Sequence, residues 1–375
     1  MANGQLTGKK ILILTVNAGA GHIQASKAIQ NGFSQLGYQA EMIDCLDFSW
    51  HPFKRIYSDG YIWLIKKFPD IWRALYKSSD NWLSIEKSSE MRKRIKRLFL
   101  SRFVKFLKEY NPDAIVCTHF LPLEISTDLK RDGKINCPIL CAITDFRVHR
   151  FWMVGNKYVD KFLVASEITK RDLMKRTPRI REDKIMVTGI PVKYQEKIRT
   201  NIPSLHEFNI LVLCGAFSVM SLEKVVNYID RIKEYFKITV AVGRNEDLIR
   251  KLRGMKFYHE VEVLGFVDNM IDLMKQCDIV ISKAGGIVSS EAMAAGLPML
   301  IVDPIPGQED NNKKYLVKKG AALSISKLNR LRDIKHNIIG LINNPVKIEM
   351  MKGAAKNIGK PNAALNCAAE VLRNL

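Results

Sequence analysis

A histidine on a glycine-rich turn near the start of the sequence is the first group that could do chemistry. The segment Gly19-Ala20-Gly21-His22 follows the apolar run 11–16, which predicts a strand. Small residues let a ligand come close to the backbone, and the N-terminus of the following helix attracts anions. A histidine with an ordinary pKa of about 6.5 can remove a proton at neutral pH. The alternative is a plain tight turn with a solvated imidazole.

A second candidate site lies in the segment 278–312, which reads DIVISKAGGIVSSEAMAAGLPMLIVDPIPGQEDNN. A predicted strand ends at Ser282, and backbone amides of the glycine turn at the next helix start are suited to a diphosphate. Glu291 could accept hydrogen bonds from both hydroxyls of a ribose, although alone it could be a surface carboxylate that favours a helix N-terminus. The residues predicted to bind a nucleotide sugar here are Ser282, Lys283, Gly285, Gly286, Ser290, Glu291, Gln308, Glu309 and Asn311.

The sequence indicates no metal ion and no cofactor besides a sugar donor. It contains no His, Cys or Asp spacing typical of a metal site and no convincing Asp-x-Asp at a strand end. The first glycine turn also lacks the G-x-G-x-x-G pattern and an acidic residue in the ribose position, which disfavours a nicotinamide cofactor. Helix N-termini and loop amides would then stabilise the charge of a phosphate leaving group.

These candidate residues stand at the ends of predicted strands that alternate with helices along nearly the whole chain. Two series of six apolar strands predict two doubly wound α/β domains that face each other across a cleft, with ligands at the carboxyl ends of the strands. The polar segment 193–209 predicts domains over 1–200 and 201–345, with a C-terminal helix over 346–375 that packs back on the first domain. The strands are predicted at 11–16, 40–46, 114–119, 139–145, 161–166, 185–190, 210–216, 237–243, 261–265, 279–283, 299–303 and 321–325.

Taken together, the motifs resemble a known enzyme family. The segment 278–312 is similar to the C-terminal domain of UDP-sugar glycosyltransferases with the two-domain GT-B fold. The segment NAGAGHIQASKAI at 17–29 is similar to the glycine-rich loop of the monogalactosyldiacylglycerol synthase and processive diacylglycerol glucosyltransferase family, which belongs to glycosyltransferase family 28. The resemblance covers 10–45 and 110–370, and the combination of motifs is more specific than any one of them.

The resemblance implies roles for residues on the acceptor side. It implies that His22 activates the acceptor hydroxyl, while Asp145 could instead be the base or could orient His22. It also implies that Gly21, Thr144 and His149 face the acceptor, the last two in the segment AITDFRVHRFW.

On the donor side, the resemblance implies that the main chain of Gly265, Phe266 and Val267 holds a uracil. It assigns the diphosphate to the turn 282–286, the ribose to Glu291, and the hexose to Gln308 and Glu309. Two further glycines complete the predicted UDP-sugar site, and they are Gly19 and Gly215. The loop that contains Gly215 is poorer in glycine than in many relatives.

The net charge of +21 is the unusual feature of the composition. Fifteen Lys and Arg against six Asp and Glu lie between His51 and Tyr110, a net charge of +9, with four of the five tryptophans in or beside this segment. Basic amphipathic helices with aromatic anchors are typical of anionic membrane surfaces. For 91–110 the alternative is a core-facing helix with a solvated basic face. The residues predicted to dock on a membrane are Trp63, Trp72, Trp82, Arg92, Lys93, Arg94, Lys96 and Arg97.

No apolar run is long enough to span a membrane, no secretory signal is evident, and seven cysteines without a CxxC pair indicate buried thiols. No nucleic-acid-binding signature is present. Together with these features, the family resemblance implies a peripheral enzyme on the cytoplasmic face of the cell membrane that moves a hexose, glucose rather than galactose, from a UDP-sugar to diacylglycerol. The transfer is expected to invert the donor linkage, to need no metal and to repeat on the product. Alternatives are transfer of N-acetylglucosamine to a polyprenyl-linked acceptor, a UDP-sugar epimerase, or a non-enzymatic UDP-sugar-sensing binder.

Overall fold

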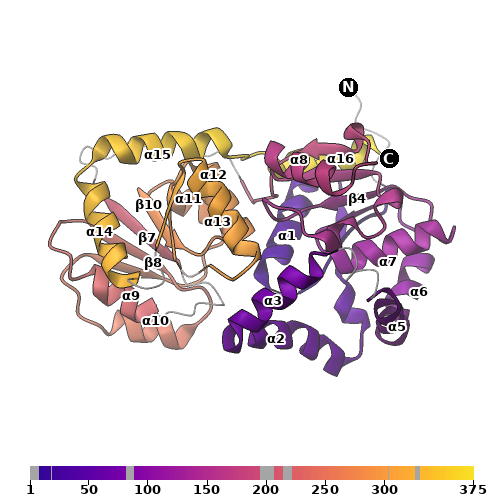
Figure 1. Ribbon diagram of the computed structural model, residues 1–375, viewed down its shortest axis with the longest axis horizontal. Helices are drawn as coiled ribbons and strands as arrows, with labels where there is room; N and C mark the ends of the chain where they lie inside the picture. Colours follow the sequence, from indigo (N-terminus) through magenta and orange to yellow (C-terminus); the bar gives the residue numbers. More distant parts are fainter. Residues whose placement is uncertain are drawn as a thin grey trace. The chain divides into compact units, whose positions relative to one another are not determined.

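The apolar runs of the sequence form two parallel sheets. The computed structural model describes residues 8–17, 19–81, 88–194, 207–213, 222–302, 304–325 and 330–375. Its strands are β1 (Ile11–Thr15), β2 (Ala40–Asp44), β3 (Ala114–Cys117), β4 (Ile139–Ala142), β5 (Lys161–Val164), β6 (Ile185–Val187), β7 (Asn209–Leu213), β8 (Lys237–Ala241), β9 (Val261–Leu264), β10 (Ile279–Ser282), β11 (Met299–Ile301) and β12 (Ala322–Ser324). They pair in parallel in the orders β2-β1-β3-β4-β5-β6 and β12-β11-β10-β7-β8-β9. Figure 1 labels β4 of the first sheet and β7, β8 and β10 of the second. The α/β fold with two parallel sheets is confirmed.

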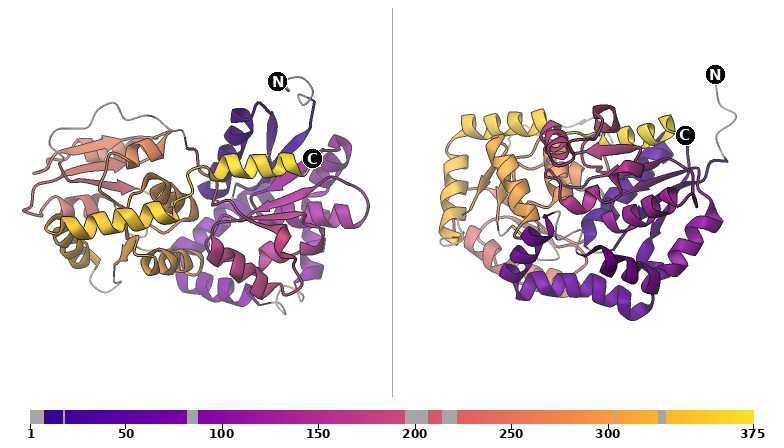
Figure 2. Two further views of the ribbon diagram at one scale, coloured as in Figure 1. Left: turned by 90° about the horizontal axis from the view of Figure 1, so that it is seen from above. Right: turned by 45° about the vertical axis from the view of Figure 1, so that its right-hand side comes forward.

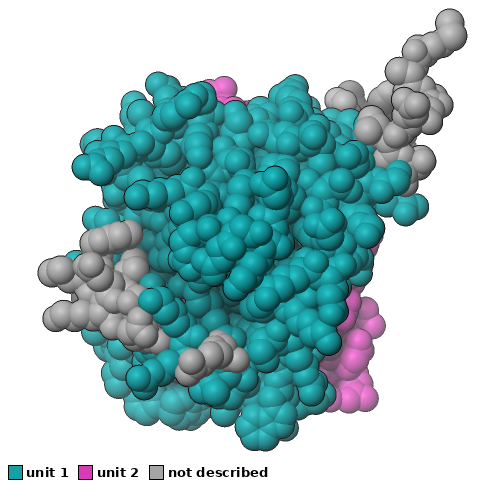
Figure 3. Space-filling view, turned by 90° about the vertical axis from the view of Figure 1, so that its right-hand side faces the viewer, with its two compact units in different colours: residues 1–193, 362–375 teal, residues 194–361 magenta. Residues whose placement is uncertain are grey.

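The chain divides into two compact units (Figure 3). Unit 1 comprises 1–193 and 362–375, and unit 2 comprises 194–361. The expected boundaries lay at 200 and 345, so the structure moves the second boundary sixteen residues toward the C-terminus and gives the last fourteen residues to unit 1. That the two units face each other across a cleft stays a prediction.

Helices connect the strands within each unit. In unit 1 they are α1 (Ala20–Gln35), α2 (His51–Lys67), α3 (Pro69–Ser79), α5 (Ser89–Phe99), α6 (Ser101–Tyr110), α7 (Phe120–Arg131), α8 (Glu167–Arg176) and α16 (Ala363–Arg373), with short 3-10 turns at Cys45–Phe48, Arg150–Met153, Asn156–Tyr158 and Glu182–Lys184. In unit 2 they are α9 (Leu222–Ile229), α10 (Glu246–Arg253), α11 (Met270–Met274), α12 (Gly286–Ala295), α13 (Gln308–Lys318), α14 (Arg330–Ile342) and α15 (Pro345–Ile358). None of these described helices is long and apolar enough to cross a bilayer.

Unit 1 is doubly wound, because alternate residues of one strand enter different cores. Leu12 and Leu14 of β1 belong to a core that also holds Phe103 of α6. Ile11 and Ile13 point into the opposite core, where they meet α1 and α16. A strand buried on both faces reads as a continuous apolar run, which is why ILILT shows no alternation.

The C-terminal segment forms two helices instead of the single helix expected over 346–375. Gly359 ends α15 in an extended conformation, and Pro361 lies just beyond it, where the helix cannot continue. α15 stays in unit 2, whereas α16 packs on α1 of unit 1 (Figure 2). A Cβ atom added to Gly32 would lie 2.6 Å from the main-chain oxygen of Ala364, so this close crossing requires a glycine.

The basic segment 91–110 forms two helices where one was expected. Leu100 separates α5 from α6, and its fully buried side chain enters the unit 1 core together with Phe103 and Leu107. The core-facing interpretation is therefore the correct one for α6, with its cations on the other face. Leu98 of α5, in contrast, is 66% exposed.

Candidate active site

His22 lies where the carboxyl ends of three neighbouring strands meet. It stands in the first turn of α1 after β1, and Thr118 and Thr144 follow β3 and β4. The ring nitrogen Nδ1 of His22 is 2.7 Å from the main-chain oxygen of Thr118 and 3.3 Å from Oγ1 of Thr144. The carboxyl ends of strands are where open α/β sheets bind ligands. The structure thus brings two of the predicted acceptor-side residues, His22 and Thr144, together.

The hydrogen bond to Thr118 fixes the tautomer of His22. A carbonyl oxygen can only accept, so Nδ1 carries the proton and Nε2 holds the lone pair. Burial lowers the pKa of His22 to about 4, partly opposed by the Thr118 carbonyl. At neutral pH the ring is therefore uncharged, with Nε2 able to accept a proton.

A group of buried hydroxyls holds Thr118 in place beneath His22. The Oγ1 atom of Thr118 lies 2.8 Å from Oγ of Ser26, 3.0 Å from Oγ1 of Thr15 and 3.3 Å from the main-chain oxygen of His22. Thr15, Ser26 and Thr118 are all fully buried. These contacts hold the side chain of Thr118, the residue whose carbonyl orients the histidine.

A second histidine and a tryptophan form a wall beside His22. The rings of His22 and His119 meet edge to face at 4.7 Å, and Trp152 lies 6.3 Å from His22. The Nδ1 atom of His119 accepts a hydrogen bond from the backbone N–H of Leu121 at 3.0 Å, which leaves its proton on Nε2. Burial, and to a lesser extent the nearby His22, holds the pKa of His119 well below its ordinary value. His119 is therefore an uncharged neighbour of His22.

The turn that begins α1 needs its first glycine. Gly19 has φ 101° and ψ 152°, a region open essentially to glycine alone. Gly21 lies one residue into the helix and is half-buried. The first turn of α1 contains no acidic residue, so its N-terminus keeps its partial positive charge.

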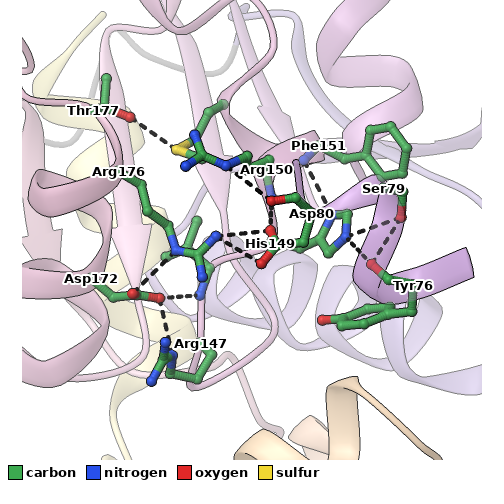
Figure 4. A network of polar contacts seen from close by, with 12 residues as sticks. Tyr76, Ser79, Asp80, Arg147, His149, Arg150, Phe151, Asp172, Arg176 and Thr177 are labelled. Atoms are coloured by element: carbon green, nitrogen blue, oxygen red, sulfur yellow. Dashed lines mark hydrogen bonds and ion pairs between the residues drawn. The ribbon is translucent and has the colours of Figure 1, made fainter. Parts of the chain in front are cut away.

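The other two predicted acceptor-side residues lie on the loop after β4. Asp145 is buried next to Thr144. His149 lies further along, where its Nδ1 accepts from the N–H of Phe151 at 3.2 Å and its Nε2 lies 3.3 Å from the main-chain oxygen of Tyr76 (Figure 4). Burial lowers its pKa. Both nitrogens of His149 thus have partners in the protein, so the contacts of this ring tie the loop to α3.

In unit 2 the predicted diphosphate turn leads from β10 into α12. Ser282 ends the strand, and Gly285 is the N-cap of the helix, with φ −64° and ψ 145°. Gly285 has no side chain that could cap the helix, and the first turn of α12 contains no acidic residue. The first N–H groups of a helix have no hydrogen-bond partners within the helix. The side chain of Asn312 donates to the main-chain oxygen of Ala284 at 3.0 Å and holds the turn from α13. This arrangement suits an anion.

Glu291 lies in the second turn of α12, five residues after its first residue. Burial raises its pKa to about 7. Burial disfavours the charged form of this carboxyl group, whereas hydrogen bonds from ligand hydroxyls would stabilise that charged form. The predicted ribose contact is chemically consistent with this site. Ser290 beside it is buried.

The residues predicted to contact a hexose begin α13. The Oε2 atom of Glu309 accepts from the N–H of Ile305 at 2.6 Å, which ties the preceding loop to the helix. Gln308 and Asn311 are half-buried, whereas Asn312 is fully buried on the turn described above. The predicted uracil loop lies at the end of β9, where the half-exposed ring of Phe266, between Gly265 and Val267, packs against the guanidinium of Arg244 at 4.7 Å.

Two of the cations predicted to dock on a membrane face the interior of unit 1, and that part of the prediction is wrong. Lys96 is buried and pairs with Glu124 at 3.1 Å and with Asp128 of α7. The Nε atom of Arg92 also lies 3.1 Å from Glu124. These carboxylates come from a helix thirty residues away, so the amphipathic pattern of α5 did not reveal them.

The other residues of that prediction differ in exposure. Lys93 and Arg94 are exposed, Trp63 is 56% exposed and Trp72 is half-buried. Trp82, Gly215 and the side chain of Arg97 lie outside the described residues.

Sequence reasoning missed several residues of the site, namely Thr15, Ser26, Thr118, His119, Trp152 and Asn312. A signal did exist for Thr118 and His119, because they directly follow the apolar strand AIVC as His22 follows ILILT. Asn312 was passed over for its neighbour Asn311, since a sequence does not fix which side of a helix faces a turn.

Comparisons with known proteins give a consistent result for both halves of the chain. The family model described as monogalactosyldiacylglycerol (MGDG) synthase matches residues 22–192, and the model for the glycosyltransferase family 28 C-terminal domain matches residues 209–366. A processive diacylglycerol beta-glucosyltransferase of Bacillus cereus (strain G9842) is 28% identical over 370 residues, which cover 95% of this chain and 91% of that protein.

Solved structures with the same fold are more distant in sequence. MurG of Acinetobacter baumannii superimposes with a TM-score of 0.61 and 15% identity, over 97% of this chain and 99% of that one. The calicheamicin glycosyltransferase CalG4 gives a TM-score of 0.64 and 11% identity, over 98% of this chain and all of that one. These likenesses show the two-domain α/β fold of GT-B glycosyltransferases.

Proposed function

Because the chain belongs to the monogalactosyldiacylglycerol synthase family and carries a glycosyltransferase family 28 C-terminal domain, we propose that it transfers glucose from UDP-glucose to the hydroxyl of 1,2-diacylglycerol. The transfer inverts an α-linked donor to a β-glucoside, needs no metal, and repeats on the product. The product is a membrane glycolipid. The name of the Bacillus cereus relative supports the choice of acceptor, of glucose over galactose, and of repeated transfer.

The hydrogen bond between His22 and Thr118 is the observation that carries this proposal. It leaves Nε2 of His22 with a lone pair. In the proposed step Nε2 takes the proton of the acceptor hydroxyl while that oxygen forms a bond to the anomeric carbon. The bond between the anomeric carbon and the diphosphate oxygen breaks, and UDP leaves with the electron pair. One positioned base is worth about 10²–10⁴ in rate.

Features of unit 2 support a nucleoside diphosphate sugar as the donor. The N-terminus of α12 can stabilise the charge that develops on the leaving diphosphate, which is the work that a metal ion does elsewhere. Glu291 has a raised pKa, and hydrogen bonds from ribose hydroxyls would favour its charged form. Gln308 and Glu309 begin the helix that borders the same turn, and we assign the hexose to them.

Aromatic side chains around His22 support a lipid acceptor. The rings of Phe120 and Phe151 stack at 5.0 Å, and Trp152 meets Phe120 edge to face at 6.2 Å. Ligand sites with apolar walls and few polar groups suit a molecule that is mostly hydrocarbon. A water-soluble acceptor would gain little from these rings.

Exposed apolar side chains with nearby cations support contact with an anionic bilayer. Large apolar side chains on and around α2 and α3 are from 43% to 72% exposed, and they are Trp50, Ile56, Trp63, Phe68, Ile71 and Leu75. The segment 51–110 carries a net charge of +9. Apolar anchors and basic residues together are what anionic lipid surfaces bind.

A product assay tests this proposal. The purified protein is incubated with diacylglycerol in anionic vesicles and with UDP-glucose, UDP-galactose or UDP-N-acetylglucosamine, and both UDP and lipid products are followed. We expect glucolipids from UDP-glucose, at a rate that excess EDTA leaves unchanged. Product from UDP-N-acetylglucosamine on a polyprenyl phosphate acceptor, or UDP binding without any product, would replace this proposal by the corresponding alternative.

A further inference from the structure

A network of charged groups joins the end of α3 to the loop that follows β4 (Figure 4). Asp80, directly after α3, accepts two hydrogen bonds from Nη1 of Arg176, at 2.8 and 2.9 Å to its two carboxylate oxygens. It also accepts the backbone N–H of Arg150 at 3.0 Å, and its main-chain oxygen accepts from Nε of Arg150 at 3.0 Å. Charge-assisted bonds of this kind are stronger than neutral ones.

The same guanidinium reaches a second carboxylate, which holds the other part of the loop. Nε of Arg176 donates to Asp172 one turn earlier in α8 at 3.2 Å. Asp172 in turn accepts the backbone N–H of Val148 at 3.0 Å and pairs with Arg147 at 3.2 Å. Arg176 thus lies between two carboxylates, one fixed to α8 and the other to the end of α3.

The loop held in this way is also the loop that contacts His22. It begins with Thr144, whose Oγ1 lies 3.3 Å from Nδ1 of His22, and it ends at Arg150. His149 adds a neutral contact, because its Nε2 lies 3.3 Å from the main-chain oxygen of Tyr76 in α3. A displacement of α3 would therefore reach the loop 144–150, whose first residue, Thr144, contacts the proposed base.

α3 presents apolar side chains to the outside. Ile71 and Leu75, one turn apart, are 51% and 49% exposed. Asp80 at the end of the helix is largely covered, as is the side chain of Arg176 of α8 that binds it. The helix therefore has one face that a lipid surface could bind and one end that is fixed to the loop.

We propose that Arg176 is a positioning residue that couples α3 to the loop 144–150. Binding of α3 to a lipid surface then sets the position of Thr144 beside His22. This inference rests on the proposed function, because it assumes that a lipid acceptor reacts near His22. Arg176 touches neither reactant. Its role is to make the position of the loop 144–150 depend on the position of α3.

Substitution of Asp80 by Asn weakens the contact of Arg176 with the end of α3 and leaves its contact with Asp172 in place. The amide keeps an oxygen for the N–H of Arg150 but loses the charge that holds Arg176, while Asp172 still holds the loop. The acceptor is dihexanoylglycerol below the concentration at which it aggregates, so that it reacts with or without a surface. The surface is vesicles of phosphatidylglycerol and phosphatidylcholine that contain no diacylglycerol.

We expect the vesicles to raise the rate of the wild-type enzyme by about fivefold or more, the lower range of usual coupling between sites. The Asp80→Asn variant should sediment with the vesicles as the wild type does and keep its rate without them, but lose most of the stimulation. Asp80→Glu, which restores the carboxylate, should regain it. Asp172→Asn is the matched control, and it should lower the rate even without vesicles.

Full stimulation of Asp80→Asn would overturn the proposal, and so would a wild-type enzyme that makes glycolipid at the same rate with and without vesicles. Hydrogen exchange of the wild-type protein gives a second test that needs no variant. Vesicles should slow amide exchange in both α3 and 144–150, and slowing in α3 alone would also overturn the proposal. Because exchange needs no turnover, this test stands even if no donor yields glycolipid, an outcome that would refute the proposed function separately.

Discussion

Nδ1 of His22 lies 2.7 Å from the main-chain oxygen of Thr118, ninety-six residues later in the chain. This contact decides the chemistry of the ring, since it fixes the proton on Nδ1 and leaves Nε2 to act as a base. In the familiar triads a carboxylate does this work. A neutral carbonyl orients the ring in the same way but stabilises a charged imidazolium less.

Removal of the imidazole should abolish most of the transfer and leave donor binding intact. For His22→Ala we expect kcat to fall by about 10²–10⁴, the usual contribution of a general base. His22→Gln keeps a polar side chain of similar length and serves as the control for lost packing. Glycolipid synthesis and binding of UDP-glucose would be measured on the same preparations. Normal turnover in His22→Ala would assign the proton to another group, with Asp145 the first to test.

The pH dependence of kcat should show no protonation of His22 in the neutral range. Burial lowers its pKa to about 4, so the base form is present above that pH and is lost only as the pH falls through it. At saturating UDP-glucose, kcat should therefore have no acid limb from His22 between about pH 5 and 8. An acid limb near about pH 6.5, the value of an unperturbed histidine, would contradict the buried environment described here.

Binding of the donor should become tighter as the pH rises through neutrality. The pKa of Glu291 is raised to about 7, and ribose hydroxyls would bond to its ionised form. The ionised fraction rises from about a tenth at pH 6 to about nine-tenths at pH 8, so the Kd of UDP-glucose should fall by up to about tenfold. Calorimetry of wild type and Glu291→Gln checks this, because the amide should bind more weakly and without this pH dependence. A wild-type Kd that does not change would remove Glu291 from the ribose site.

Cations of the basic helices should differ in what they do, according to the side on which they lie. Arg94 and Arg102 are exposed, so the double change to Gln should weaken binding to anionic vesicles by about 1 kcal/mol for each charge, mainly at low salt. Lys96→Met should leave vesicle binding unchanged but lower the free energy of unfolding by about 1–3 kcal/mol, because Glu124 and Asp128 lose their buried partner. Vesicle sedimentation and thermal unfolding of both variants separate the two roles, and the reverse pattern would refute them.

A methyl group at the crossing of α1 and α16 should destabilise unit 1. In Gly32→Ala the new Cβ would lie 2.6 Å from the main-chain oxygen of Ala364, and overpacking of this kind costs about 1–3 kcal/mol. Gly60→Ala in α2 is the matched control, because nothing lies within 4 Å of its new Cβ. It should raise the stability by about 0.5–1 kcal/mol through helix propensity alone. Equal Tm values for the two variants would show that α16 moves to accommodate the methyl group without loss of stability.

Much of the fold could be predicted because strands buried on both faces are local apolar runs. All twelve predicted strands occur in the described residues, although several end one to three residues earlier than expected. Thr118 and Thr144, for example, were assigned to strands but lie just past them, where they contact His22. Residues directly after the carboxyl end of a strand are the ones that can contact a ligand in an open α/β sheet.

What could not be predicted depends on partners that are distant in the sequence. Lys96 has the pattern of a membrane-facing cation, and only its pairing with Glu124 and Asp128 shows that it points inward. The acceptor-side role of His149 stays a prediction, but the contacts of its ring nitrogens with the backbone of Phe151 and Tyr76 could not be foreseen. Strand register, the orientation of a helix about its axis and ion pairing depend on contacts between distant residues. They therefore cannot be predicted from the local pattern of one sequence.

The return of α16 to unit 1 has a consequence for the order of biosynthesis. Cys367, Ala368 and Val371 complete the core that Ile29 and Phe33 of α1 begin, but the ribosome makes them only after all of unit 2. Unit 1 is thus begun before unit 2 and completed after it, in contrast to the usual domain-by-domain order from the N-terminus. Until α16 leaves the exit tunnel, the nascent chain carries an uncovered apolar face, and translation that stops near residue 360 would leave that face to chaperones and proteases.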